Sequence, residues 1–259
     1  QAAEQLARQV LAGAPYTSQR IGQGVLALAY SRLGDALRAQ GHYADAIIAT
    51  RQAVVGYEAA QGPGGQGTIS ALSALGYLYS LDGDVAKSLI AQRDVSQRAQ
   101  ARWGNRSQYT LVEQLNLGSQ EQEAGDLKAA LIDFQEAEQG LLAVSGEHSP
   151  TVQAARAGLA GVLSQLDRNV EALALVEHVD PVAYQASTSD PGRAAVLKAL
   201  RARILLRLGR RAEGLPQMQQ ALRDMRGAGR TDRPDVAVRA AARRARCDPG
   251  QRGSDRGAP

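Results

Sequence analysis

Three histidines and one cysteine are the side chains of this chain with the widest catalytic and metal-binding repertoire. His42, His148 and His178 lie far apart in the sequence, without the paired spacing of metal ligands, and Cys247 stands apart from all three. The single cysteine has no partner for an internal disulfide. Carboxylates are numerous, but no pair of them is marked for general acid–base work. We therefore expect no metal site and no catalysis by this segment.

A glycine-rich turn matches the spacing of a dinucleotide-binding loop. Gly62, Gly64 and Gly67 satisfy the pattern G-x-G-x-x-G, but a dinucleotide site needs that loop between a strand and a helix. The residues before Gly62 have the apolar spacing of a helix instead. No glycine-rich loop ends in Lys-Ser or Lys-Thr, as a Walker-type phosphate loop would. We interpret the turn as a connection between helices and expect no cofactor.

An internal repeat dominates the chain. The pair Leu33-Gly34 returns as Leu75-Gly76 and Leu117-Gly118, and each step is 42 residues. Repeats of this size indicate stacked helical or strand units that bury their apolar faces only against their neighbours, so function is expected on an extended surface. Two further ladders keep the step, one of turn residues and one of small residues: Gly41, Gly83, Gly125, Asp167 and Gly209, and Ala46, Ser88, Ala130, Ala172 and Gly214.

Composition favours an all-helical chain whose charge is concentrated at one end. Aromatic residues make up 4% of the 259 residues, and the abundant Ala, Leu and Gly suit closely packed helices better than a sheet. Residues 1–225 carry 21 basic and 22 acidic groups, whereas residues 226–259 carry nine and four. No apolar run approaches the roughly 20 residues of a membrane span, and no signal peptide is visible. The repeat array is thus near neutral and the tail basic.

The apolar spacing and the turn residues predict a series of helix pairs. A first helix ends at Gly41 and a second begins at Tyr43 and ends near Gly62, because glycine readily adopts the left-handed conformation that closes a helix. Pro181 should end the second helix of the fourth pair near Val179 and leave a long segment, 182–190. The remaining pairs are predicted at 66–82 with 85–103, 106–124 with 127–144, 150–166 with 168–178, and 191–208 with 211–227.

Leu33-Gly34 followed by Gly41-His42-Tyr43-Ala44-Asp45-Ala46 resembles the tetratricopeptide repeat, and the 42-residue length with the connector 146–150 resembles its kinesin light chain variety. The resemblance implies an all-α, right-handed superhelix (α-solenoid) of about five helix-turn-helix units. It also implies that the Leu-Gly pairs let first helices of adjacent units approach, and that the small residue lies where the two helices of a unit cross. The implied divisions are the end of a preceding repeat or cap at 1–23, units near 24–65, 66–105, 106–149, 150–190 and 191–227, and a tail at 228–259.

The resemblance further implies that a peptide binds on the concave face, which the first helices line. Asn116 is expected to hydrogen-bond a peptide backbone through its amide, and Tyr77 to be a rigid anchor or to contact the adjacent unit. In the fourth unit Ala157 and Gly161 are expected to face the groove. The predicted peptide-binding residues are Arg38, Ser73, Tyr77, Asn116, Ser119, Arg203 and Arg207.

The last predicted helix pair opens with a basic run. Seven basic residues and no acid lie between Arg193 and Arg211, and Arg203 and Arg207 share one helical face. This end of the groove could hold an acidic peptide segment by charge-assisted hydrogen bonds. The alternative, which we favour, is a solvated basic face, because surface charge by itself carries little specificity.

We expect a non-catalytic protein–protein interaction or sensory module that binds a peptide or protein. The resemblance implies a place in a larger bacterial signalling or transcription-regulatory protein, and a start at Gln1 without an initiator Met suggests an excerpt. The alternative is a structural spacer or a module that self-associates through its terminal units. We expect the tail, 228–259, to be a failed sixth repeat followed by disorder, and disfavour nucleic-acid or membrane binding by it. The compartment stays open: the cytoplasm is favoured, and the periplasm would require an upstream membrane anchor.

Overall fold

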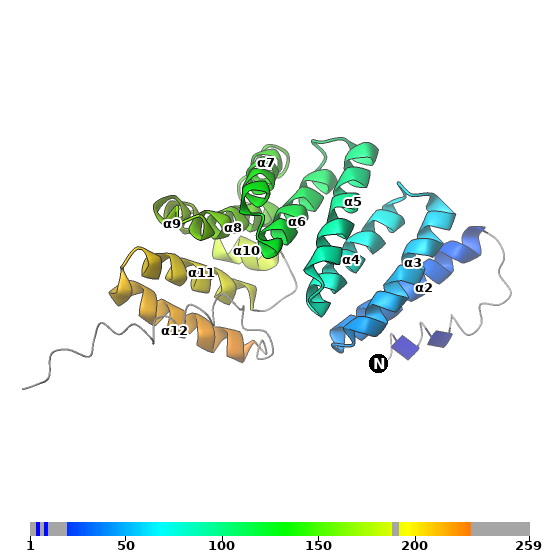
Figure 1. The fold of residues 1–259 in the computed structure, drawn as a ribbon, viewed down its shortest axis with the longest axis horizontal. Helices are drawn as coiled ribbons and strands as arrows, with labels where there is room; N and C mark the ends of the chain where they lie inside the picture. The colour runs from blue at the N-terminus through cyan, green and yellow to red at the C-terminus, as the bar shows by residue number, and fades with distance from the viewer. Residues whose placement is uncertain (1–3, 6–7, 10–19, 188–191, 229–259) are drawn as a thin grey trace, which may run out of the picture. The chain divides into compact units, whose positions relative to one another are not determined.

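A computed structural model describes residues 4–5, 8–9, 20–187 and 192–228, and within these ranges the chain is entirely helical (Figure 1). Two compact units divide the chain: an N-terminal unit, Gln1–Gly146, and a C-terminal unit, Glu147–Pro259. The helices of the N-terminal unit are α2 (Arg20–Ala39), α3 (Tyr43–Gln61), α4 (Gln66–Asp82), α5 (Val85–Trp103), α6 (Gln108–Ala124) and α7 (Leu127–Ser145). Those of the C-terminal unit are α8 (Pro150–Gln165), α9 (Asn169–Glu177), α10 (Pro181–Ala186), α11 (Arg193–Arg207) and α12 (Arg211–Gly227).

The predicted helix pairs are present. The bounds of α4, α5 and α12 are the predicted ones, and the other paired helices from α3 onward begin and end within two residues of the prediction. The helix α2 begins at Arg20, four residues before the predicted start of the first unit at residue 24. The all-α solenoid of repeated helix-turn-helix units is confirmed. Within the described ranges, no helix is long and apolar enough to cross a lipid bilayer. The predicted tail, 228–259, lies outside the described residues from residue 229 onward.

The fourth helix pair differs from the prediction after α9. In place of a long segment after Pro181, residues 181–186 form the short helix α10. The side chain of Asp180 accepts hydrogen bonds from the backbone amides of Val182 at 2.8 Å and Ala183 at 3.3 Å and so caps the helix. Pro181 occupies the first helical position, where its missing N–H is not needed. The same proline therefore ends one helix and begins another.

The ladder of turn residues closes the first helix of each pair. At the end of α4, Gly83 has φ 91°, and its amide and that of Asp84 donate to the carbonyls of Ser80 and Tyr79. This is the left-handed cap that satisfies the last carbonyl groups of a helix. Asp167 occupies the equivalent position after α8 with φ 60°, the one positive φ of a non-glycine residue in the described ranges. The prediction that Asp167 substitutes for glycine is confirmed.

A close crossing joins the two helices of each pair. At the α4–α5 crossing, the fully buried Ser88 donates a 2.8 Å hydrogen bond to the carbonyl of Gly76. A Cβ at Gly118 would lie 3.3 Å from the ring of Phe134 on α7, and a Cβ at Gly34 would meet Thr50 on α3. The Leu-Gly glycines therefore face the second helix of their own pair. The expectation that they bring first helices of adjacent units together is wrong, whereas the predicted place of the small residues is confirmed.

The fifth pair has the same crossing, but the glycine is on its second helix and the larger of the two small residues is on its first. Ala202 occupies the glycine position of α11, and Gly214 occupies the small-residue position of α12. A Cβ at Gly214 would lie 3.0 Å from the carbonyl oxygen of Ala202 and 2.8 Å from Leu206 Cγ. One of the two crossing residues must be very small because the helix backbones approach closely there. The exchange explains how the fifth pair packs without a Leu-Gly motif.

Each unit has its own core. In the N-terminal unit the core runs between successive pairs and includes Leu37, Ile47, Leu75 and Leu78. Phe134 of α7 is also buried, with 1% of its side chain exposed. In the C-terminal unit Met218 and Met225 of α12 pack on alanines of α11, and α8, which contacts α9, α10 and α11, is buried along almost its whole length.

Candidate peptide-binding face

The first helices of the N-terminal unit, α2, α4 and α6, hold five of the predicted site residues at repeated positions. Tyr77 and Ser119 are one step of 42 apart, and both are exposed. Arg38 is exposed as well, while Ser73 and Asn116 are half-buried. Tyr77 and Ser119 occupy equivalent positions of successive first helices, and we call the surface made by them with Arg38, Ser73 and Asn116 the first-helix face.

Tyr77 is the prominent aromatic group of this face. Its side chain is 48% exposed on α4, although the buried residues on both sides of it, Gly76 and Leu78, belong to the core. The guanidinium of Arg38 on α2 lies 6.0 Å from the centre of the Tyr77 ring. This is the outer limit of a cation–π contact, so the guanidinium lies near the ring without covering it. The ring therefore presents an amphipathic surface to solvent beside a positive charge.

Glu113, which the sequence analysis did not select, connects the polar side chains of this face. Its Oε2 atom accepts hydrogen bonds from Ser73 Oγ at 3.1 Å, Gln92 Nε2 at 3.0 Å and Asn116 Nδ2 at 3.1 Å. Gln92 also donates to the Glu113 carbonyl oxygen at 3.0 Å. The network joins α4, α5 and α6, so Ser73 and Asn116 are held in place by a carboxylate instead of being free. Its only sequence signal is the three-residue spacing of Glu113 and Asn116 on one helix.

Two more polar groups of the face have partners on the protein. Ser119 Oγ donates to the Leu115 carbonyl of its own helix at 3.1 Å. Ser80 Oγ on α4 donates to Glu123 Oε2 on α6 at 2.7 Å. The hydroxyls of Ser73 and Ser80 on α4 are thus both held by glutamates of α6. The face carries acidic groups as well as Arg38, and it is not a purely basic or acidic surface.

A second glutamate of α6, Glu121, is buried on the other side of the helix. It is 4% exposed, and its Oε1 accepts a 3.3 Å hydrogen bond from Arg93 Nη2 of α5. Burial, followed by a hydrogen bond and charge repulsion from Asp133, raises the pKa of Glu121 from 4.5 to about 7, against the lowering effect of Arg93. The group therefore holds a proton near neutral pH, which links the packing of α5, α6 and α7 to pH.

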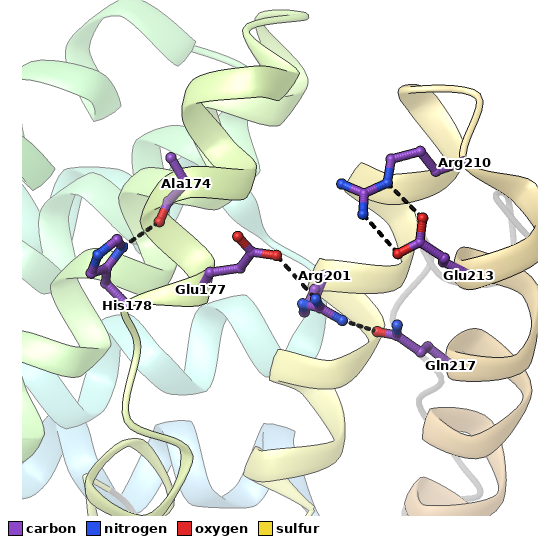
Figure 2. A network of polar contacts seen from close by, with 7 residues as sticks. All are labelled: Ala174, Glu177, His178, Arg201, Arg210, Glu213 and Gln217. Carbon is purple, nitrogen blue, oxygen red and sulfur yellow. Dashed lines mark hydrogen bonds and ion pairs between the residues drawn. The ribbon is translucent and has the colours of Figure 1, made fainter.

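The basic run of α11 is largely paired within the C-terminal unit. Figure 2 shows Arg201 bridging two elements, with bonds of 3.0 Å to Glu177 and 2.7 Å to Gln217. Lys198 pairs with Asp224 at 2.8 Å. Arg201 stands where the motif has leucine, so this bridge replaces an apolar contact. The acids that pair with Arg201 and Lys198 come from α9 and α12, which the local sequence of α11 does not reveal.

The two predicted binding arginines of α11 also lie in packed surroundings. Arg207 donates to the carbonyl of Ser164 at the end of α8 and pairs with Asp167 Oδ1 at 3.1 Å. Arg203 is half-buried. Arg207 thus stabilises the end of α8, and these contacts favour the ion-paired surface over the reading in which α11 holds an acidic peptide. Their role in peptide binding stays a prediction.

The fourth pair offers no open groove at the predicted positions. Ala157 and Gly161 are both buried in α8. The expectation that they face a ligand is wrong, because α8 is covered on nearly all of its faces. Trp103 at the end of α5 stacks on Tyr109 of the next first helix, α6, with ring centres 5.1 Å apart.

The described ranges show no group of three or more His, Cys, Asp or Glu side chains arranged to hold a metal ion. The turn with Gly62, Gly64 and Gly67 connects α3 to α4, with a helix before it as predicted. Arg98 and Arg102 of α5 donate to the carbonyls of Pro63 and Gly64 in this turn. The turn is thus held by side chains of the next pair.

Comparison with known proteins identifies the fold. No protein-family model and no curated protein matches the chain. The structure is similar to that of BtubC (BKLC) from P. vanneervenii, with a TM-score of 0.65 and 18% identity over 90% of this chain and 91% of that chain. It is also similar to the nearly identical TPR-like repeats of a putative kinesin light chain from Podosopora anserina (TM-score 0.61, 18% identity, 78% and 96% covered). A third similar structure is a Rap protein in complex with competence and sporulation factor (TM-score 0.65, 11% identity, 87% and 59% covered).

Proposed function

Because the chain has a tetratricopeptide-repeat fold, we propose that it is a non-catalytic protein-interaction module that binds a peptide or protein segment across the first-helix face. The observation that carries the proposal is the exposed Tyr77 ring, with Arg38 on one side and the Ser73–Glu113–Asn116 network on α4 and α6. The similar Rap structure is a complex with competence and sporulation factor. This supports a peptide ligand for the fold, while the ligand here depends on these residues.

The groups of the face have complementary tasks in this proposal. Tyr77 supplies apolar contact area with little loss of side-chain entropy, as aromatic anchors do at interfaces. Asn116 makes one side-chain hydrogen bond among the described residues, to Glu113, which leaves its carbonyl oxygen and second N–H for a peptide backbone. Arg38 can pair with a carboxylate of the ligand, and Glu113 with a basic side chain. The ligand is therefore an extended segment with an apolar residue between charged ones.

The wider setting follows from the same proposal. A repeat array of this kind brings a ligand to another domain or protein, so we place the chain in a bacterial signalling or transcription-regulatory protein. That placement rests on the resemblance to light-chain-type repeats, and fold by itself does not determine function. No step of the proposal needs a cofactor.

The test is a peptide selection on the full chain. A displayed random-peptide library would be panned on immobilised protein, and the winning peptide measured by fluorescence anisotropy. We expect Tyr77→Ala and Asn116→Ala each to weaken binding by about tenfold or more, because each removes roughly 1.4 kcal/mol or more of contact energy. The matched control is Val170→Ser, at an exposed apolar residue of the second helix α9. Equal binding by all variants, or no selected peptide, would contradict the proposal.

A further inference from the structure

Three exposed isoleucines form a regular row on the second helices of the N-terminal unit. Ile48, Ile90 and Ile132 are 42 residues apart, and each is the sixth residue of its helix, α3, α5 or α7. Their side chains are 61%, 69% and 55% exposed. Scattered apolar residues are ordinary on protein surfaces, but here the same large residue recurs at three equivalent exposed positions of successive second helices. We call this row the isoleucine ladder.

Charged residues flank the ladder one turn further along each helix. With 3.6 residues per turn, the third residue after an isoleucine lies to one side of it and the fourth lies to the other. The third positions hold Arg51 and Arg93, which contact the next first helix in equivalent ways, Arg51 bonding the Tyr79 hydroxyl and Arg93 bonding Glu121. The fourth positions hold Asp94 and Glu136. In this turn, the basic groups therefore lie on one side of the isoleucines and the acidic groups on the other.

When the charges along the three helices are set against the same charges in reverse order, opposite signs meet. Along α3, α5 and α7 the third positions read Arg, Arg, Gln and the fourth positions read Gln, Asp, Glu. A two-fold rotation about an axis parallel to α5 sets α3 of one copy against α7 of the other and exchanges the two sides. It places Arg51 opposite Glu136 and Arg93 opposite Asp94. Every charged residue at the third positions then meets an acid.

The preceding turn shows the same relation. The residue three before each isoleucine reads Asp45, Lys87 and Ala129 along the helices, and the residue four before reads Ala44, Ala86 and Lys128. The same rotation brings Asp45 opposite Lys128 and sets Lys87 and Ala129 opposite alanines. No like charges meet at any of these positions, as complementary interfaces require.

We propose that a second copy of this chain docks on the isoleucine ladder about this two-fold axis. Ile90 then packs on Ile90 of the other copy, and Ile48 packs on Ile132. An isologous contact uses one surface twice, so the three kinds of ion pair occur six times in the interface. The occupant is a second copy of the chain because the charges of this surface complement the same charges in reverse order. A surface that binds an unrelated partner does not need this self-complementarity.

This inference goes beyond peptide binding, because it concerns the second helices and not the first-helix face. It also differs from self-association through terminal repeats. In the docked pair, Tyr77 and Arg38 on the first helices of each copy take no part in the contact. A dimer would therefore present two peptide-binding faces, which raises the avidity for a ligand that carries two binding segments.

The first arm of the test measures the mass of the full chain against concentration by sedimentation velocity. We expect the wild-type protein to dimerise with rising concentration and Ile90→Asp, which places a carboxylate against its own symmetry mate, to raise the dimer dissociation constant at least tenfold. Val182→Asp is the matched control, since Val182 of α10 is 77% exposed in the other unit. A wild-type protein that stays monomeric at several hundred micromolar, or a dimer unaffected by Ile90→Asp, would overturn the proposal.

The second arm tests the pairing itself by charge exchange. Arg51→Glu and Glu136→Arg should each weaken self-association about tenfold, because each creates two like-charge contacts. Mixed together, the two variants should form a heterodimer of near wild-type affinity, since the carboxylate introduced in one variant then faces the guanidinium introduced in the other, and the reciprocal pair is native. Native mass spectrometry of variants with different tags would count the three dimers, and circular dichroism would check that each variant is folded. Failure of the mixture to recover dimer refutes the two-fold arrangement.

Discussion

Neutralising Glu121 should remove most of the pH dependence of the stability of the N-terminal unit between pH 5 and 8. Burial and Asp133 raise the pKa of Glu121 in the folded chain from 4.5 to about 7. The folded state therefore keeps the proton to higher pH than the unfolded state does. The stabilisation is complete below pH 4.5 and is lost as pH rises through about 7, where the folded chain must bury a carboxylate anion.

The size of the effect follows from the shift and its surroundings. A pKa change from 4.5 to about 7 corresponds to at most about 3 kcal/mol. The side chain of Arg93 that pairs with Glu121 is 50% exposed, so water reaches the pair and screens it. We expect the free energy of unfolding of the wild-type chain to fall by about 1–2 kcal/mol from pH 5 to pH 8. Glu121→Gln, which is uncharged and of the same size, should exceed wild type at pH 8 by a similar amount.

The assay is urea unfolding followed by tryptophan fluorescence. Trp103 is the single tryptophan of the chain and lies at the end of α5, stacked on Tyr109, so it reports the N-terminal unit. Hydrogen bonds with Lys87 lower the pKa of Asp84. The contribution of Asp84 to stability is therefore lost only at acidic pH, outside the window from pH 5 to 8. Glu123→Gln, exposed on the same helix, is the control and should keep the wild-type slope. A wild-type stability that is flat over this window, or an unchanged slope in Glu121→Gln, would refute the reasoning.

Substitutions at four further positions test the packing and capping of the helices by urea unfolding followed by circular dichroism. Gly76→Ala should stabilise the chain by about 0.5 kcal/mol, because its Cβ meets Ala91 Cβ at an ordinary contact distance of 3.4 Å and the helix propensity improves. Gly214→Ala should cost about 1–2 kcal/mol, because its Cβ would lie 2.8 Å from Leu206 Cγ and 3.0 Å from the Ala202 carbonyl oxygen. Phe134→Ala should cost about 3–5 kcal/mol, since the ring is fully buried, and a loss below about 1 kcal/mol would contradict the core assignment. Asp180→Ala should cost about 1 kcal/mol by uncapping α10, and Asp180→Asn should retain most of the stability.

Local chemistry in the sequence was enough to predict the repeat and the helices. Turn residues at a constant step locate the helix ends, because a left-handed cap needs glycine or a tolerated substitute such as Asp167. Pro181 correctly marked the end of α9, but the prediction missed α10, since Asp180 as a cap and Pro181 as a first helical residue also describe a helix start. The exposed ring of Tyr77 follows from helical phase, which places it away from its buried neighbours.

The tertiary structure decided which polar groups meet. Glu113 joins Ser73, Gln92 and Asn116 from three helices, and Arg207 reaches the end of α8, about 40 residues away in sequence. Such contacts depend on helix rotation and side-chain length, which a repeat pattern does not contain.

The candidate surfaces show the same division. The constant step of the repeat made the alignment of equivalent residues readable, the three isoleucines included, because equivalent positions must line up when units stack in register. Their exposure is a property of the folded molecule, since a second helix buries one side against its own pair and the next first helix and leaves the other side to solvent. The sequence therefore determined the fold and its rows of residues, and the packing of the helices decided which rows a partner can reach.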